Sequence, residues 1–139
     1  MTGKEQVREL MNELLSFAEK MLGEHGEFHP FGGYLKVSGA VVQVGVQLEG
    51  TAQQKVAMLV ESFKKIAAKS EAVAFGIATN VKLPHDDGSK SDAIKFFLEH
   101  QDGYCAEVFF CYELGCENSI EITDTIAQQG QLLFFARPN

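Results

Sequence analysis

The fold is decided by a predicted β-hairpin over residues 92–114, which read DAIKFFLEHQDGYCAEVFFCYEL. Two runs rich in β-branched and aromatic residues flank the pair Asp102-Gly103, and Asp-Gly between such runs is a strong signal for a tight hairpin turn. We therefore predict a strand over residues 92–100, a turn at 101–103 and a returning strand over 104–114. Because the turn is so short, the two strands run antiparallel.

Three Phe doublets mark the strands, and they are Phe96-Phe97, Phe109-Phe110 and Phe134-Phe135. Adjacent residues of a strand point to opposite faces of the sheet, so each doublet places one Phe on each side. A sheet with one solvated face should alternate apolar and polar residues, and these strands do not. We expect the second face to be covered by a second or strongly curved sheet, by a homodimer that packs sheet on sheet, or by a ligand in a concave pocket. We favour the homodimer or the curved sheet.

Two amphipathic helices are predicted outside the hairpin. Residues 7–22 repeat apolar side chains at three- and four-residue steps, and Gly23 is a plausible C-cap. The second helix begins at Thr51, which has the spacing of a capping box with Gln54, and it ends near Ser70. We expect both helices to pack on one face of the sheet.

Further strands are predicted over residues 34–38, 41–48, 72–83, 119–125 and 131–136, which gives six to seven strands in the order αββαβββββ. The small residues Ala72, Ala74, Gly76 and Ala78 share one strand face, so we expect a helix to approach the sheet closely there. Residues 1–139 are thus predicted to form a single α+β domain with an antiparallel sheet.

The net charge limits the choice of partners, because 12 Lys and Arg stand against 19 Asp and Glu, a formal charge of −7. Nucleic-acid binding needs clustered cations, and no such cluster is present. No stretch approaches the roughly 20 apolar residues that span a bilayer, so we expect no membrane partner. The lack of a signal-peptide pattern and the odd count of 3 Cys predict a cytoplasmic protein.

The residues between Lys95 and Arg137 include many acids and no Lys or Arg. We favour a solvated face that keeps the protein soluble. The alternative is an acidic face that attracts a basic protein partner.

The most distinctive segment is residues 27–34, EFHPFGGY. His29 lies beside flexible glycines and could act as an acid, a base or a ligand group. With Phe31, Tyr34 and the more distant His85 it forms the candidate ligand pocket. The alternative, which we favour, is a plain connection from helix to strand in which Pro30 sets a turn.

Signals for catalysis and metal binding are weak. No CxxC, HxH or HExxH spacing is present, and the common phosphate-loop patterns are absent. Cys105 and Cys111 are interpreted as packed small hydrophobes, because the neighbouring Glu107 and Glu113 disfavour a thiolate. We assign no catalytic residue, metal ligand or cofactor, and we lean towards a protein that is not an enzyme.

The candidate interface consists of Phe97, Phe109, Glu99 and Glu107. The two Phe point to the sheet face that the helices leave open. Glu99 and Glu107 could face each other across the hairpin, which would raise the pKa of one carboxyl. We favour two solvated edge carboxylates.

The N-terminal helix, the turn at residues 28–32 (FHPFG) and the hairpin that begins at Ser91-Asp92 resemble small uncharacterised bacterial proteins of αββαβ type. The resemblance covers most of the chain and implies an α+β fold. No activity is established for such proteins, so no site residue is carried over. Some small acidic bacterial proteins act as immunity proteins against toxins, which is an analogy of class.

We therefore expect a non-enzymatic interaction protein that forms a homodimer through an apolar sheet face. An immunity-like version would add a basic toxin as partner. The alternative is a small-molecule-binding protein or enzyme, with a pocket near residues 28–34 and with His29 and Tyr34 as polar handles.

Overall fold

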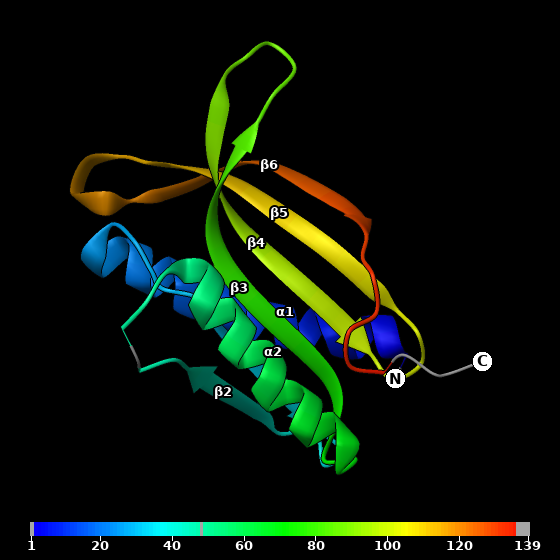
Figure 1. Cartoon of the computed structure of the whole chain (residues 1–139). Coiled ribbons are helices and arrows are strands. Elements are labelled where there is room, and N and C mark those ends of the chain that lie inside the picture. The colour runs from blue at the N-terminus through cyan, green and yellow to red at the C-terminus, as the bar shows by residue number, and fades with distance from the viewer. Residues whose placement is uncertain (1, 48, 136–139) are drawn as a thin grey trace.

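A computed structural model describes residues 2–47 and 49–135 of the chain (Figure 1). Its elements are α1 (Gly3–His25), β1 (Phe31–Lys36), β2 (Val41–Gly45), α2 (Ala52–Ala68), β3 (Ala72–Pro84), β4 (Lys90–His100), β5 (Cys105–Leu114), the short 3₁₀ helix η1 (Cys116–Asn118) and β6 (Ile120–Gln129). The predicted α+β class is confirmed, with six strands in the described residues.

The six strands form one antiparallel sheet in the order β2-β1-β3-β4-β5-β6. The predicted hairpin is confirmed: β4 pairs with β5, and Gly103 takes a φ of 103° at the turn. The amide of His100 donates to the carbonyl of Tyr104 at 2.8 Å, which closes the loop. The only neighbours in the sheet that are not consecutive in sequence are β1 and β3, because α2 carries the chain from β2 back across the sheet.

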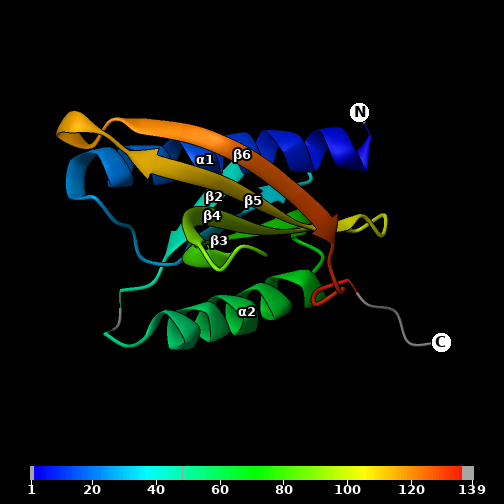
Figure 2. The same ribbon diagram turned by 90° about the horizontal axis from the view of Figure 1, so that it is seen from above.

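The two helices lie on opposite faces of the sheet, so the prediction of both on one face is wrong (Figure 2). In β3, Ala74 and Ala78 pack in the cluster with α1, whereas Phe75 and Ile77 pack in the cluster with α2. All residues from Ala72 to Ala78 are buried. A strand that is apolar at every position requires a cover on both sides, and the unbroken apolar run AVAFGIA over residues 72–78 is the sequence sign of this.

The predicted close approach of a helix to the row of small residues is confirmed for Ala74, Gly76 and Ala78, which face α1. Ala72, the first residue of the predicted row, packs instead in the cluster with α2. A Cβ added at Gly76 would lie 2.8 Å from Cδ1 of Leu14, and one at Gly33 would lie 3.0 Å from the other methyl of Leu14. On the opposite face, a Cβ at Gly32 would lie 2.9 Å from the ring of Phe63 in α2. Because these three residues are glycines and have no side chain, both helices can pack closely against the sheet.

The helix ends follow capping chemistry. The predicted capping box of α2 is confirmed: the amide of Gln54 donates to Thr51 Oγ1 at 3.1 Å, and the amide of Thr51 donates to Gln54 Oε1 at 2.9 Å. The predicted C-cap of α1 at Gly23 is wrong, because the helix continues to His25. Gly26 instead takes the left-handed conformation, with φ 74°, and its amide donates to the Leu22 carbonyl.

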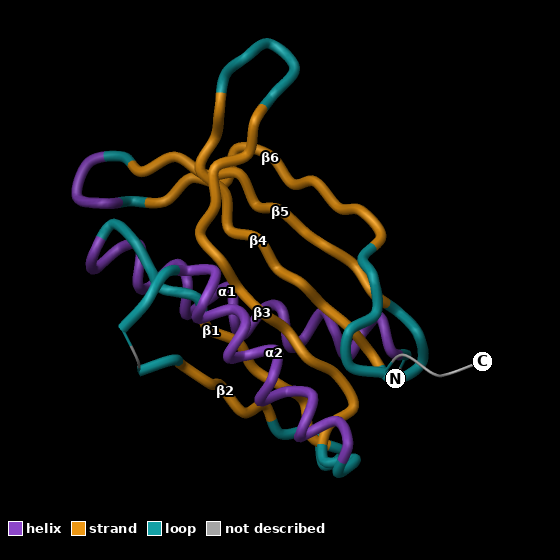
Figure 3. The backbone as a smooth tube through the Cα atoms, viewed as in Figure 1, coloured by secondary structure: helices purple, strands orange, loops and turns teal. Residues whose placement is uncertain are grey.

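The strand predicted over residues 131–136 does not form in the part that the structure describes, and Ala136 lies outside the described residues. Residues 131–135 are irregular and fold over the α2 face of the sheet (Figure 3). Phe134 and Phe135 both pack with Phe75, so this doublet does not divide between two faces. We call residues 131–135 the closing segment.

The tight contact of α1 with β3 gives a stability prediction. Gly76→Ala should lower the free energy of unfolding by about 1–3 kcal/mol, because the added methyl overpacks a buried site against Leu14. Gly45→Ala in β2 is the matched control, since its Cβ would meet nothing within 4 Å. Urea unfolding of both variants measures the difference, and equal midpoints would contradict the packing described.

Candidate ligand groove on the α2 face

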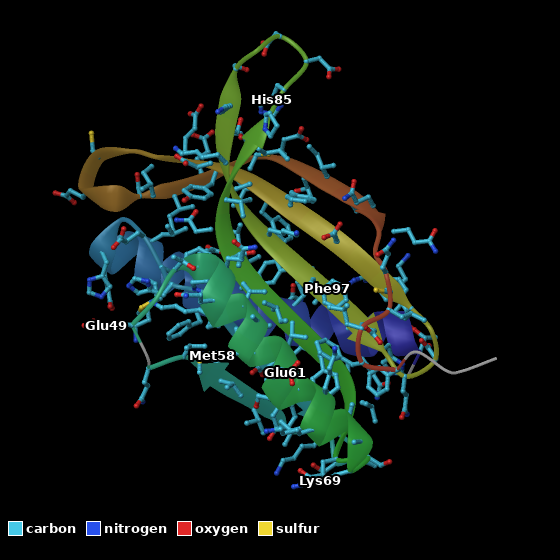
Figure 4. The ribbon with its side chains drawn as sticks, viewed as in Figure 1. Glu49, Met58, Glu61, Lys69, His85 and Phe97 are labelled. Atoms are coloured by element: carbon cyan, nitrogen blue, oxygen red, sulfur yellow. The ribbon has the colours of Figure 1, made fainter. Side chains whose placement is uncertain are left out.

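A groove of about 670 Å³ lies between α2, the central strands and the closing segment. Helix α2 contacts β1 and β3, so it leaves the α2 face of β4 and β5 without a helical cover. The apolar lining of the groove comes from all three parts, and it consists of Val56, Val60, Ile77, Val81, Phe97 and Leu133. Figure 4 shows Phe97 on the stretch of sheet between α2 and the closing segment.

The register of the sheet explains why these side chains meet. Phe97 of β4 pairs with Ile77 of β3 on one side and with Glu107 of β5 on the other. Side chains of paired residues point to the same face. The groove floor is therefore a row across three strands, and it begins as apolar and ends in a carboxylate.

The polar wall of the groove is built around an ion pair between β4 and β5. Lys95 Nζ lies 2.9 Å from Glu107 Oε2, and Gln128 of β6 donates to the other carboxylate oxygen at 2.8 Å. Hydrogen bonds from Lys95 and then Gln128 hold the pKa of the Glu107 carboxyl below its ordinary value. Lys95 Nζ also lies 5.8 Å from the centre of the Phe109 ring. Thr79, Asn80 and Gln131 add neutral polar groups to the lining.

Glu99 lies under the closing segment and is 0% exposed. Its carboxylate accepts hydrogen bonds from three consecutive amides, those of Leu133 at 2.6 Å, Phe134 at 3.0 and 3.1 Å, and Phe135 at 2.6 Å. Successive amides that converge on one anion form a nest. The interpretation of Glu99 as a solvated edge carboxylate is therefore wrong. In the ladder it lies opposite Cys105, not opposite Glu107.

The other residues of the candidate interface are less hidden than Glu99. Phe97 and Phe109 are half-buried on the α2 face, and Phe97 lies 6.0 Å from Phe134 between ring centres. Glu107 is half-buried by its contacts with Lys95 and Gln128. Two of the four candidates, Phe97 and Glu107, thus line the groove. Phe109 lies beside Lys95 of the groove lining, and Glu99 holds the closing segment.

The predicted pocket residues are brought together only in part. His29 and Phe31 line a second cavity of about 490 Å³ beside the end of α1. The Nδ1 atom of His29 lies 3.2 Å from Nζ of Lys55, an almost buried residue of α2. Tyr34 packs instead on the α2 face with Phe63 and Phe75. His85 lies at the tip of the β3–β4 hairpin (Figure 4), where its Nε2 atom forms a hydrogen bond with the Ser91 hydroxyl.

Across residues 2–47 and 49–135, no three His, Cys, Asp or Glu side chains gather as metal ligands would. Within the same ranges, neither helix is long and apolar enough to cross a bilayer.

Sequence reasoning missed most of the groove lining. Val56 and Val60 lie in the predicted second helix, but nothing in the sequence says that this helix stops short of β4. Leu133 was assigned to a strand, since its neighbours are apolar and aromatic. A sign of an irregular segment in the sequence is Gly130. Its amide donates to the carbonyl of Cys105 at 3.1 Å, at the point where the chain leaves the sheet.

The cysteines give a prediction that tests the burial of this face. Burial, and then the charges of Glu99 and Glu107, raise the pKa of Cys105 to about 11, and burial raises the pKa of Cys111. Cys116 is exposed. At pH 8 a disulfide thiol reagent should therefore react quickly with one thiol, and Cys116→Ser should remove that fast phase. A second fast thiol in the folded protein would contradict the placement of Cys105.

Comparison with known proteins gave no match: no family model, no curated protein and no solved structure matches this chain. The resemblance to small bacterial proteins stays a prediction. The function is therefore inferred from the geometry of the chain itself.

Proposed function

We propose that this protein binds a small, largely apolar molecule in the groove on the α2 face. The observation that supports this is the groove itself, with about 670 Å³ and apolar lining from a helix, the sheet and the closing segment. Ligand sites in proteins typically measure roughly 300–1,000 Å³ and combine apolar walls with a few polar groups. The candidate pocket near residues 28–34 ranks below this groove, because Tyr34 and His85 lie elsewhere.

The polar wall indicates the chemistry of the ligand. Lys95 and Glu107 neutralise each other, while Thr79 and Gln131 offer both donors and acceptors. The side-chain oxygen of Asn80 is bonded to Tyr112. The chain carries a formal charge of −7, which disfavours the approach of an anion. The ligand that fits best is a neutral molecule with an apolar body and one hydrogen-bonding end.

The proposed role is binding and not catalysis. A general acid or base works best when its pKa lies near the working pH. The pKa of the Glu107 carboxyl is held below its ordinary value by Lys95 and Gln128, so it stays ionised and paired. The three cysteines are free thiols, which suits a reducing cytoplasmic setting.

A matched pair of Trp substitutions in α2 tests the groove. Val60 lines it, whereas the next residue, Glu61, is exposed on the outer side of the helix (Figure 4). Val60→Trp should fill the space and weaken binding of the neutral fluorescent probe N-phenyl-1-naphthylamine at least about tenfold, the loss of about 1.4 kcal/mol of contact. Glu61→Trp should leave binding unchanged. Equal titration curves for the two variants would refute the site.

Self-association through the sheet is a second candidate, supported by strand β6. This strand forms one edge of the sheet, and all of its residues from Glu121 to Gln129 are exposed. It carries two exposed apolar side chains, Ile122 at 38% and Ile126 at 36%. Ile126 lies opposite the half-buried Phe109 on the α2 face. An unpaired edge strand with apolar residues is a template for pairing with another chain, here a second copy in a homodimer.

Light scattering over a range of concentrations tests this second candidate. If a dimer forms through the Phe109–Ile126 face, Ile126→Lys should shift the protein to monomer, because it places a charge in an apolar contact. Thr125→Lys makes a charge change of similar size on the opposite face of the same strand and should shift it less. A monomeric wild-type protein at all concentrations would exclude the homodimer.

A further inference from the structure

We propose that the closing segment, residues 131–135, is a movable wall of the groove, and that Glu99 is the positioning residue that holds it closed. The inference rests on the proposed function only where it concerns the ligand. The hold of Glu99 on the segment is argued from the chain alone.

The carboxylate of Glu99 and the backbone amides of the closing segment are hydrogen-bond partners of each other. Glu99 is 0% exposed, and within the described residues it forms no ion pair. Its hydrogen-bond donors there are the amides of Leu133, Phe134 and Phe135. A buried carboxylate is costly unless hydrogen bonds replace its water. If the segment lifts, the carboxylate regains water, and if the carboxylate is lost, three amides lose their acceptor.

The segment has few attachments through its backbone other than those to Glu99. It forms no strand, and in the described chain its nearest backbone hydrogen bond is that of Gly130 to Cys105 at its base. Its side chains anchor it: Phe134 lies 4.7 Å from Phe75 and 5.9 Å from Phe63 between ring centres, and Phe135 lies 5.4 Å from Phe75. Segments held by few hydrogen bonds open locally at lower free energy than strands inside a sheet. The closing segment can therefore open while β3 and β4 stay paired.

Movement of the segment would change the groove directly. Gln131 and Leu133 line it, and Phe134 contacts Phe97 on its floor. Leu133 therefore contributes a side chain to the groove and an amide to Glu99. Closing the segment completes the apolar wall, and opening it exposes the groove. The rates at which a ligand enters and leaves follow this motion.

The first test compares Glu99→Gln with Glu113→Gln, an exposed carboxylate of β5, by hydrogen–deuterium exchange. Glu99→Gln keeps the shape of the side chain but replaces an accepting oxygen with an NH₂ donor that faces amides. Exchange at residues 133–135 should rise about tenfold or more, because hydrogen bonds to charged groups are among the stronger ones. The amides of β3 should keep their protection, and Glu113→Gln should change neither region.

The second readout is the dissociation rate of N-phenyl-1-naphthylamine, measured by stopped flow. The dissociation rate of the probe should be higher in Glu99→Gln than in the wild-type protein, as should the exchange rate at residues 133–135. Faster exchange with unchanged probe dissociation would overturn the role of the segment as a wall. If exchange is faster in Glu99→Gln but neither the wild-type protein nor the variant binds the probe, the proposed function is refuted. The hold of Glu99 on the closing segment is then supported.

Unchanged exchange at residues 133–135 in Glu99→Gln would overturn the proposal that Glu99 holds the closing segment. If that variant also loses protection in β3, Leu133→Pro provides the second test, since it removes one donor to Glu99 and keeps the carboxylate. It should deprotect Phe134 and Phe135. If those two amides exchange in Leu133→Pro at the same rate as in the wild-type protein, the proposal that Glu99 holds the closing segment is overturned as well.

Discussion

The structure depends on one constraint, the burial of β3 on both faces from Ala72 to Ala78. A strand with no solvated side needs a cover above and a cover below, and two helices provide them. Small residues toward α1 let that helix lie close, whereas Phe75 and Ile77 fill the thicker layer under α2. Because α2 packs against β1 and β3, it leaves β4 and β5 without a helical cover on the same side of the sheet. The groove and the closing segment both occupy the area that remains.

Local sequence patterns were sufficient for both helices and for the strands that form the sheet, but not for residues 131–135. The Asp102-Gly103 turn, the Thr51–Gln54 capping box and the row of small residues in β3 each act over a few residues, and each is found as expected. The side on which a helix packs is set by contacts between distant segments. Periodicity within one helix is the same on either face, so the sequence of α2 could not reveal its side.

The candidate site was less accessible to sequence reasoning for the same reason. Phe97, Phe109 and Glu107 belong to the interface that the sequence predicts, and of these Phe97 and Glu107 line the groove. The role of Glu99 escaped, because an acidic residue near the end of a strand is normally solvated. Its partners are backbone amides, and backbone groups carry no signature in the sequence. The strand predicted over residues 131–136 failed likewise, since Phe134 and Phe135 are as apolar as strand residues but both pack with Phe75.

The nest around Glu99 has a consequence for the order in which the protein can fold during synthesis. Strands β1, β3 and β4 are complete before residues 131–135 leave the ribosome, so a sheet formed early would present Phe75 and an unmatched carboxylate to water. The charge of Glu99 would then keep this unfinished aromatic surface hydrated and would discourage its contact with other chains. The same carboxylate that is buried at the end thus acts as a solubilising group at the beginning, until the amides that replace its water have been made.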